Sequence, residues 1–147
     1  MTGPNIVLMV ADDMGYGDFG LYSEGRVHTP ALDELASQGI RLTQHYAGSA
    51  VCSPSRAALL TGRYPIRTGA VTPQEVLGND RIALEEATIG DSFKAAGYAT
   101  GMVGKWHNGA FDPRYHPNAR GFDEFAGFDV IWSRKSDSLY LTVYLGR

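Results

Sequence analysis

The fold of this chain is decided by residues 5–13, Asn5-Ile6-Val7-Leu8-Met9-Val10-Ala11-Asp12-Asp13. The apolar run is continuous rather than alternating, which is typical of a strand buried on both faces of a parallel sheet. Polar groups follow at its carboxyl end, where open α/β sheets bind their ligands. We therefore expect residues 5–11 to form a buried parallel strand that carries Asp12 and Asp13 just beyond its end.

Helix and strand signals alternate further along the chain. Thr29 as N-cap, Pro30 at the first helical position and Gly39 as a closing glycine predict a short helix over residues 31–38. Apolar and polar side chains then alternate over residues 40–46, which predicts a second strand.

The second half of the chain continues this alternation. A capping-box pattern, Thr88-Ile89-Gly90-Asp91, predicts the start of another helix that ends at Gly97. Strands are expected over residues 98–103 and 139–145, whereas residues 64–87 show no pattern that can be assigned. Strands that alternate with helices indicate an α/β fold with a mainly parallel sheet.

Composition and charge narrow the class of protein. The chain has 147 residues, 44% of them hydrophobic, which suits one globular domain. Its net charge of -3 provides no basic field for nucleic acid or an anionic membrane surface, so we expect neither partner. No apolar run is long enough to span a bilayer. No secretory signal precedes the first strand, so we expect a cytoplasmic protein if Met1 is the true start, and otherwise the location is unknown.

Cys52 is the only cysteine and lies where a helix is expected to begin. Ser53 is placed to cap this helix, Pro54 to occupy its first position and Gly62 to end it. Backbone N–H groups at a helix N-terminus favour anions, so a sulfate ester suits this position. From the residue type alone, a lone cysteine is more often a small core hydrophobe.

The stretch Cys52-Ser53-Pro54-Ser55-Arg56, with Thr61-Gly62-Arg63 after it, resembles the signature of the type I sulfatases. This resemblance implies that a formylglycine-generating enzyme oxidises Cys52 to formylglycine, whose hydrate is the nucleophile. One hydroxyl of the geminal diol attacks sulfur, and deprotonation of the other lets the hemiacetal collapse to the aldehyde and expel sulfate. A serine or thiol nucleophile would instead need water to attack the sulfur a second time.

Asp12 and Asp13 are candidate ligands for a divalent cation, because Ca²⁺ and Mg²⁺ prefer carboxylate oxygens. From the residues alone, the alternative is a solvated aspartate pair that starts a turn. Residues 5–18 resemble the opening strand and metal-binding pair of sulfatases. The resemblance implies a Ca²⁺ ion, with Mg²⁺ as the other choice, bound by Asp12, Asp13 and the modified Cys52.

Arg56, Lys105 and His107 are further candidate catalytic residues. Arg56 lies one helical turn after Cys52, within reach of the formylglycine hydroxyls or the sulfate. In an extended chain, Lys105 and His107 point to the same side and offer a cation and a proton carrier. The alternatives are a surface arginine, and solvated polar residues on either side of a core-edge Trp106.

The motif Gly104-Lys105-Trp106-His107 is similar to a sulfatase motif whose lysine binds sulfate and whose histidine contacts the formylglycine. Lys105 and His107 are therefore also implied as substrate-binding residues. Asn108 stands where sulfatases usually have leucine, which affects packing rather than catalysis. The remaining histidines have no comparable context and are predicted to be structural: His28, His45 and His116.

The resemblance covers about residues 4–128 and leaves residues 129–147 unassigned. It implies an alkaline-phosphatase-like α/β sheet flanked by helices, and we expect residues 1–147 to be the N-terminal part of such a catalytic domain. The implied activity is hydrolysis of a sulfuric ester, arylsulfatase-like, on a small sulfate ester or a sulfated sugar. The alternatives are a truncated, non-catalytic fragment and a phosphate or phosphonate ester hydrolase on the same scaffold.

The motif at Cys52 makes a prediction that mass spectrometry can test. When the chain is expressed together with a formylglycine-generating enzyme, the peptide that contains Cys52 should carry an aldehyde or its hydrate in place of the thiol. The same peptide from Cys52→Ala should be unmodified. Recovery of only the thiol form would show that the motif is not a modification site in this chain.

Overall fold

The computed structural model describes residues 3–74, 78–109, 112–128 and 141–146. Contacts divide the chain into two compact units, and each is described by itself. The sheet unit comprises residues 1–12 and 47–147, and the small unit comprises residues 13–46. Every helix in the described part of the chain is too short or too polar to cross a membrane.

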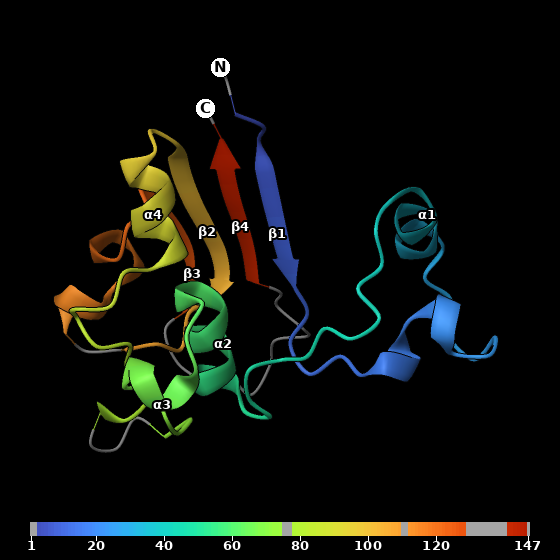
Figure 1. The fold of residues 1–147 in the computed structure, drawn as a ribbon, viewed down its shortest axis with the longest axis horizontal. Coiled ribbons are helices and arrows are strands. Elements are labelled where there is room, and N and C mark those ends of the chain that lie inside the picture. The colour runs from blue at the N-terminus through green and yellow to red at the C-terminus, as the bar shows by residue number, and fades with distance from the viewer. Residues whose placement is uncertain (1–2, 75–77, 110–111, 129–140, 147) are drawn as a thin grey trace. The chain divides into compact units, whose positions relative to one another are not determined.

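The sheet unit is built on four strands (Figure 1). Their order across the sheet is β1-β4-β2-β3, with bounds Ile6–Val10 for β1, Leu141–Gly146 for β4, Ala99–Lys105 for β2 and Glu124–Phe128 for β3. β4 runs antiparallel to both of its neighbours, whereas β2 and β3 pair in parallel. Three of the four strands therefore point the same way, which confirms the predicted α/β class with a mainly parallel sheet.

The two strands predicted in the second half of the chain form with small differences. The strand expected over residues 98–103 is β2 and extends to Lys105. The strand expected over residues 139–145 is β4, and residues 139–140 lie outside the described residues.

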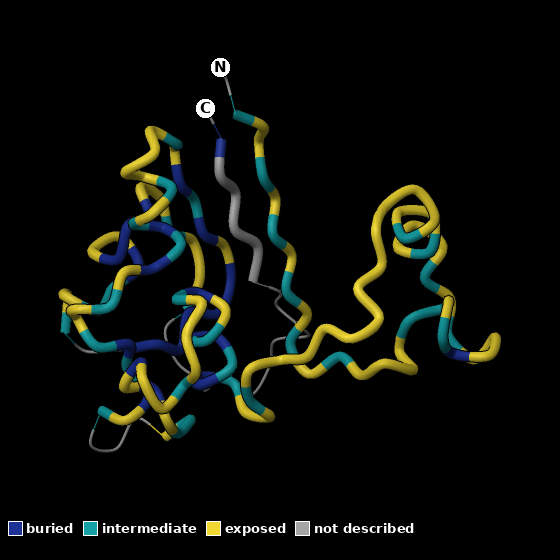
Figure 2. Tube along the Cα trace, viewed as in Figure 1, coloured by how far each residue is buried: buried dark blue, intermediate teal, exposed yellow. Residues whose placement is uncertain are grey.

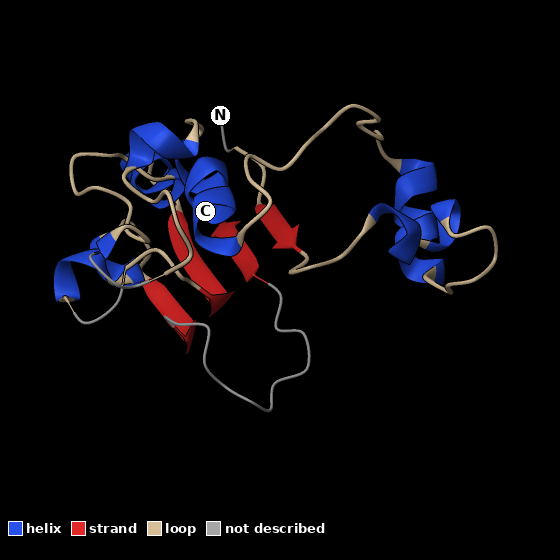
Figure 3. Cartoon of the chain, turned by 90° about the horizontal axis from the view of Figure 1, so that it is seen from below, coloured by secondary structure: helices blue, strands red, loops and turns tan. Residues whose placement is uncertain are grey.

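The expectation that the first strand is buried on both faces is wrong. Among the described residues, β1 lies at the edge of the sheet and pairs only with β4, antiparallel. Its residues alternate: Ile6, Leu8 and Val10 pack against the core, whereas Val7 and Met9 are 56% and 62% exposed. Helices α2 and α4 lie on the same face of the sheet (Figures 1 and 3). The β1 side chains on that face are therefore packed, whereas those on the opposite face are exposed.

The described residues of the sheet unit form the α-helices α2 (Cys52–Thr61), α3 (Pro65–Thr68) and α4 (Ile89–Ala95). α2 ends at Gly62, whose left-handed backbone (φ 68°) suits a residue without a Cβ, as predicted. α4 begins with the predicted capping box, in which the Thr88 hydroxyl accepts from the Asp91 N–H and the Asp91 carboxylate accepts from the Thr88 N–H. Two short 3₁₀ helices follow β2: η4 (Pro113–Tyr115) and η5 (Pro117–Ala119).

The start of α2 differs from the prediction by two residues. Val51 is the N-cap and Cys52 occupies the first helical position, so Ser53 does not cap the helix. The Ser53 hydroxyl is fully buried and donates instead to the carbonyl oxygen of Asp80, at 2.7 Å. A tertiary hydrogen bond therefore replaces the local cap and ties the start of α2 to the loop that precedes α4.

The small unit contains the 3₁₀ helices η1 (Tyr16–Asp18) and η2 (Gly20–Tyr22) and the helix α1 (Pro30–Gln38). Thr29 is the N-cap of α1, as predicted, but its hydroxyl accepts from the Gly20 N–H rather than from the helix. Gly39 ends α1 in an extended rather than a left-handed conformation.

The strand predicted over residues 40–46 does not form. These residues run as an exposed loop (Figure 2). The Ile40 side chain in it is 92% exposed. Alternation of apolar and polar residues indicates a strand only where a neighbouring strand supplies backbone hydrogen bonds, and the described residues of the small unit include no strand.

The core of the sheet unit lies between the sheet and helices α2 and α4. Its fully buried apolar residues are Ala57, Leu60, Ala70, Ile82, Met102, Trp106 and Phe122. Trp106 packs edge-on against Phe122, with ring centroids 6.3 Å apart, and its indole N–H donates to the Tyr115 carbonyl. Gly127 pairs with Gly104 across β2 and β3, where an added Cβ would lie 1.9 Å from the Gly104 carbonyl oxygen. The end of β2 is thus held both by the contacts of Trp106 and by the close pairing of Gly104 with Gly127 in β3.

The capping box of α4 predicts a measurable stability loss. Thr88→Ala removes the cap and also leaves the Arg120 carbonyl without the Thr88 hydroxyl, which donates to it at 2.7 Å. We expect the free energy of unfolding to fall by about 1–2 kcal/mol in chemical denaturation. Thr88→Ser should keep most of the wild-type free energy of unfolding. Thr43→Ala, in the exposed 40–46 loop, should change the free energy of unfolding by less than about 0.5 kcal/mol. Equal losses in the two alanine variants would contradict a capping role.

Candidate active site

Arg56 connects the three elements that carry the predicted site residues. It lies in the first turns of α2 and is only 4% exposed. One of its terminal nitrogens, Nη1, donates to the Lys105 carbonyl oxygen at the end of β2, at 2.5 Å. The other, Nη2, lies 3.3 Å from Asp12 Oδ1, just beyond the end of β1. The alternative of a surface arginine is therefore wrong, and the start of α2 lies at the carboxyl ends of β1 and β2.

Asp12 is held between two cations. Its Oδ2 accepts a hydrogen bond from Lys105 Nζ at 3.1 Å, and its Oδ1 faces Arg56. Burial alone raises the pKa of the Asp12 carboxyl, but the Lys105 hydrogen bond and the Arg56 charge outweigh it and hold the pKa below its ordinary value. Two positive charges thus surround one negative charge, and the surplus favours an anionic ligand.

His107 is fully buried, next to this ionic cluster. Its Nε2 lies 2.9 Å from the carbonyl oxygen of Pro73, and its backbone is left-handed (φ 53°) rather than extended as expected. Burial lowers the pKa of His107 and the Lys105 charge lowers it further, while the Pro73 hydrogen bond opposes them. The net shift is downward, which keeps the imidazole neutral around neutral pH.

Cys52 occupies the first position of α2 and is half-buried. It lies one helical turn before Arg56, at the end of the helix whose free N–H groups attract anions. The alternative of a fully buried core cysteine does not fit this partial exposure. The alternative of solvated polar residues beside a core-edge Trp106 does not fit Lys105 either, because the lysine is only 7% exposed and the tryptophan lies inside the core.

The predicted metal ligands supply only part of a cation site. Both oxygens of Asp12 contact cationic side chains, and Asp13 is exposed with a left-handed backbone (φ 59°). Within the described ranges, no group of three or more His, Cys, Asp or Glu side chains is arranged to hold a metal ion. Ca²⁺ takes six to eight oxygen ligands, so the described residues do not complete a Ca²⁺ site.

The other histidines and Asn108 lie as follows. His116 Nδ1 accepts from the Asn118 N–H and its ring packs edge-on against Phe125, which is a structural role. His28 and His45 are exposed residues of the small unit. Asn108 is fully buried; its Nδ2 donates to the Trp106 carbonyl and its Oδ1 has no hydrogen-bond partner.

Two carbonyl groups that position site residues were not predicted from the sequence. The Pro73 carbonyl accepts from His107, and the Asp80 carbonyl accepts from Ser53, which is next to Cys52. Both belong to residues 64–87, where no pattern could be assigned. Every residue has a backbone carbonyl, so the sequence contains no signal that distinguishes these two.

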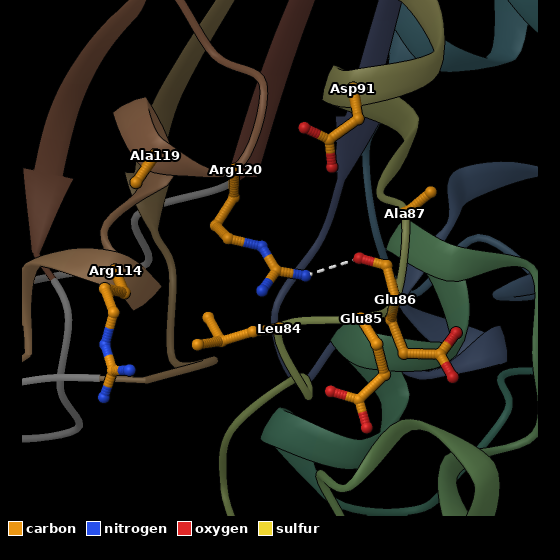
Figure 4. Close-up of a pocket in the computed structure, with 8 residues that line it drawn as sticks. All are labelled: Leu84, Glu85, Glu86, Ala87, Asp91, Arg114, Ala119 and Arg120. Carbon is orange, nitrogen blue, oxygen red and sulfur yellow. Dashed lines mark hydrogen bonds between the residues drawn. The ribbon is translucent and has the colours of Figure 1, made fainter.

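Each unit also contains a pocket among its described residues. One of about 300 Å³ is lined by eight residues around Arg120, which donates to the carbonyl of Glu86 (Figure 4). Arg120 also donates to the carbonyl of Ala83. Arg120 is 4% exposed and was also missed by the sequence reasoning; its contacts show that it fastens the loop before α4. The second pocket, of about 420 Å³, belongs to the small unit and is lined mainly by apolar residues of α1 and the 39–42 segment.

Comparison with known proteins identifies relatives over most of the chain. A family described as Sulfatase matches residues 4–144. Arylsulfatase H of Canis lupus familiaris is 47% identical over 136 residues, covering 84% of this chain and 24% of that protein. N-acetylgalactosamine-6-sulfatase of Sus scrofa is 48% identical over 134 residues, covering 84% of this chain and 25% of that protein. The chain thus spans about a quarter of the length of the curated relatives it matches.

Solved structures agree with this result. The crystal structure of Ps i-CgsB superimposes with a TM-score of 0.76 at 40% identity, over 83% of this chain and 27% of that one. A second crystal structure, of Ps i-CgsB in complex with k-i-k-neocarrahexaose, gives a TM-score of 0.71 at 37% identity, over 82% of this chain and 27% of that one.

The bridging contacts of Arg56 predict a large effect of its removal. Arg56→Ala leaves the Lys105 carbonyl unpaired and removes one counterion of Asp12, so the free energy of unfolding should fall by about 3 kcal/mol. Arg63→Ala is the matched control, since Arg63 follows α2 and binds Glu86 but is 48% exposed. That change should cost at most about 1 kcal/mol. Similar losses in urea denaturation of the two variants would contradict a structural role specific to Arg56.

Proposed function

The chain belongs to the sulfatase family, and on this premise we propose that it carries the nucleophile and the anion-binding residues of a site that hydrolyses sulfuric esters. The observation that carries this proposal is the position of Arg56. A single buried guanidinium contacts the residues at the ends of β1 and β2 and lies one turn after Cys52. Four of the six residues expected from the sequence to act together are thereby connected through one side chain: Asp12, Cys52, Arg56 and Lys105.

The charges around Arg56 suit a sulfate group. Lys105 uses one of its three N–H donors on Asp12, which leaves two for sulfate oxygens. Each terminal nitrogen of Arg56 contacts a protein oxygen, while its Nε has no hydrogen-bond partner. We propose that Arg56 acts through its charge and by fixing Lys105. Asp12 offsets one of the two positive charges and keeps both side chains in place. The result is a rigid cationic site beside Cys52, which stabilises the negative charge that develops as sulfur is attacked.

Cys52 is the residue that we propose to act as the nucleophile, after oxidation to formylglycine by a formylglycine-generating enzyme. The sulfatase family generally uses this group together with a divalent metal. The hydrated aldehyde would supply one hydroxyl to attack sulfur and a second to release sulfate. His107, which is neutral and buried, is the proposed proton carrier for these steps.

The metal is a separate proposal. Asp12, Asp13 and the oxidised Cys52 are our proposed ligands for Ca²⁺, or for Mg²⁺. The described residues offer fewer oxygens than Ca²⁺ takes, so they would hold only part of its coordination shell. Cation binding at Asp12 would also have to compete with Lys105 and Arg56 for the same two oxygens.

The names of the relatives indicate the class of substrate. One relative is called an arylsulfatase and another an N-acetylgalactosamine-6-sulfatase, and the similar crystal structure holds a neocarrahexaose. We therefore propose a small sulfate ester or a sulfated sugar as the substrate of the site that includes this chain.

Hydrolysis of an aryl sulfate tests the proposed function. Protein expressed with a formylglycine-generating enzyme should release the phenol, and both a chelator and Cys52→Ala should reduce the rate to background. Cys52→Ala should leave the folded state intact, which circular dichroism can verify. Equal rates for the wild type and Cys52→Ala would contradict a catalytic role and would favour a non-catalytic chain. A matched aryl phosphate should react more slowly than the sulfate; the reverse order would favour a phosphate ester hydrolase.

A further inference from the structure

The guanidinium of Arg81 is held in place without a hydrogen bond to any described residue. Its carbon Cζ lies 5.3 Å from the centroid of the Tyr115 ring, which is a cation–π contact. Its Nε lies 3.9 Å from Asp80 Oδ1, close enough for charge attraction but too far for a hydrogen bond, and has no hydrogen-bond partner. These neighbours fix the plane of the guanidinium and leave its N–H groups unused.

Two glycines make room for this arrangement. A Cβ added at Gly78 would lie 3.1 Å from both Cζ and Nε of Arg81. A Cβ added at Gly109 would lie 2.5 Å from Tyr115 Cβ, well inside the contact distance of two carbon atoms. Both glycines have a positive φ, of 70° and 122°, which residues with a side chain rarely adopt. The backbone therefore admits the arginine at one position and the tyrosine at the other.

The stacked pair lies next to the candidate active site. Asp80, the preceding residue, accepts through its carbonyl from the Ser53 hydroxyl at 2.7 Å, and Ser53 follows Cys52 in α2. The Tyr115 carbonyl accepts from the indole N–H of Trp106, at the end of β2. The pair is thus attached to the two elements that carry the proposed nucleophile and the proposed sulfate-binding lysine.

The accessible nitrogens of Arg81 indicate the class of ligand. Its side chain is 31% exposed, and because Nε is buried, the nitrogens that remain accessible are Nη1 and Nη2. These two nitrogens form a planar fork that matches two oxygens of a carboxylate or a sulfate. A single hydroxyl oxygen would engage this fork less completely. The geometry therefore favours an anionic group with two or more oxygens.

No described carboxylate occupies the fork. Asp80 approaches from the Nε side and is itself only 1% exposed. The charge of Arg81 also acts on Asp112, but both oxygens of Asp112 accept from Arg114. Asp80 therefore holds the guanidinium by charge and leaves its terminal nitrogens to a ligand.

We propose that Arg81, stacked on Tyr115, binds a second anionic group of the substrate, a carboxylate or a sulfate on its alcohol part. This inference rests on the proposed function for the identity of the molecule that carries the group. Arg81 acts in specificity rather than in the chemical step, because its contact is the same before and during the reaction. Such uniform binding lowers KM and leaves kcat unchanged. The site then prefers polyanionic sugars over simple aryl sulfates.

Binding of unreactive anions tests this proposal without any measurement of hydrolysis. Glucuronate supplies a carboxylate, galactose 6-sulfate supplies a sulfate, and galactose is the neutral control. Each is added to Cys52→Ala while the Nε–H signal of Arg81 is followed by nitrogen-15 NMR; the signal is identified by its loss in Arg81→Lys. A saturable shift with either anion supports the proposal and identifies the preferred group. No shift with either anion, or an equal shift with galactose, would overturn it.

Kinetics with matched substrates test the role in specificity. One substrate is a sulfated disaccharide that contains a uronate, and the other is the same disaccharide with that carboxylate reduced to an alcohol. Arg81→Gln should raise KM for the uronate substrate by about 10-fold or more, because it removes a charged hydrogen-bond donor, and should not change kcat. KM for the reduced substrate should not change. Equal increases for both substrates would show that Arg81 does not read the anion.

Two further variants serve as controls. Arg67→Gln removes an exposed arginine of α3 and should not change KM for either substrate. Tyr115→Phe keeps the aromatic ring under the guanidinium and should resemble the wild type, whereas Tyr115→Ala should raise KM for the uronate substrate alone. A wild-type KM in Tyr115→Ala would contradict the role of the ring.

The outcomes also distinguish this proposal from the proposed function. If no sulfate ester is hydrolysed but the Arg81 signal responds to the anions, the proposed function fails and the anion site stands. If esters are hydrolysed but the signal responds to neither anion, the anion site is wrong and the proposed function stands.

Discussion

The arrangement of the site depends on one buried guanidinium. Arg56 contacts an oxygen of Asp12 and the carbonyl of Lys105, and it is placed by the helix that starts with Cys52. These contacts span 44 and 49 positions in the sequence, so no local pattern could hold the same groups together. A buried charge is tolerated only where it is paired and hydrogen-bonded. Arg56 meets this condition only when β1, β2 and α2 are assembled, which links formation of the site to formation of the fold.

Features that depend on neighbouring residues in the sequence were predicted well. The capping box at Thr88, the glycine that ends α2 and the strand that leads to Lys105 follow from local backbone and side-chain preferences. The family motif also identified Cys52 and Arg56, which the structure places one turn apart on the same helix. For these elements, the local preference and the tertiary structure agree.

The wrong predictions concern features that depend on distant residues. Residues 40–46 have the alternation of a strand but no neighbouring strand in the described part of the small unit. β1 has the continuous apolar run of a buried strand, yet it lies at the edge of the sheet with one face exposed. Ser53 is a residue type that often caps helices, but its hydroxyl donates to a carbonyl 27 positions away in the sequence. In each case the outcome depends on which distant residues the topology brings next to the element. A single sequence does not reveal that topology.

The loop before α4 has a consequence for how accurately the reacting groups are held. Its Asp80 carbonyl holds Ser53 beside Cys52, the proposed nucleophile, and its Pro73 carbonyl holds the ring of His107. Within the loop, the Asn79 carbonyl accepts from the Val71 and Thr72 N–H groups, which joins the two ends that make these contacts. One backbone segment thus contacts both the residue next to Cys52 and the side chain of His107. A small displacement of this segment would move both groups in the same direction, so the distance between them would vary less than the position of either one.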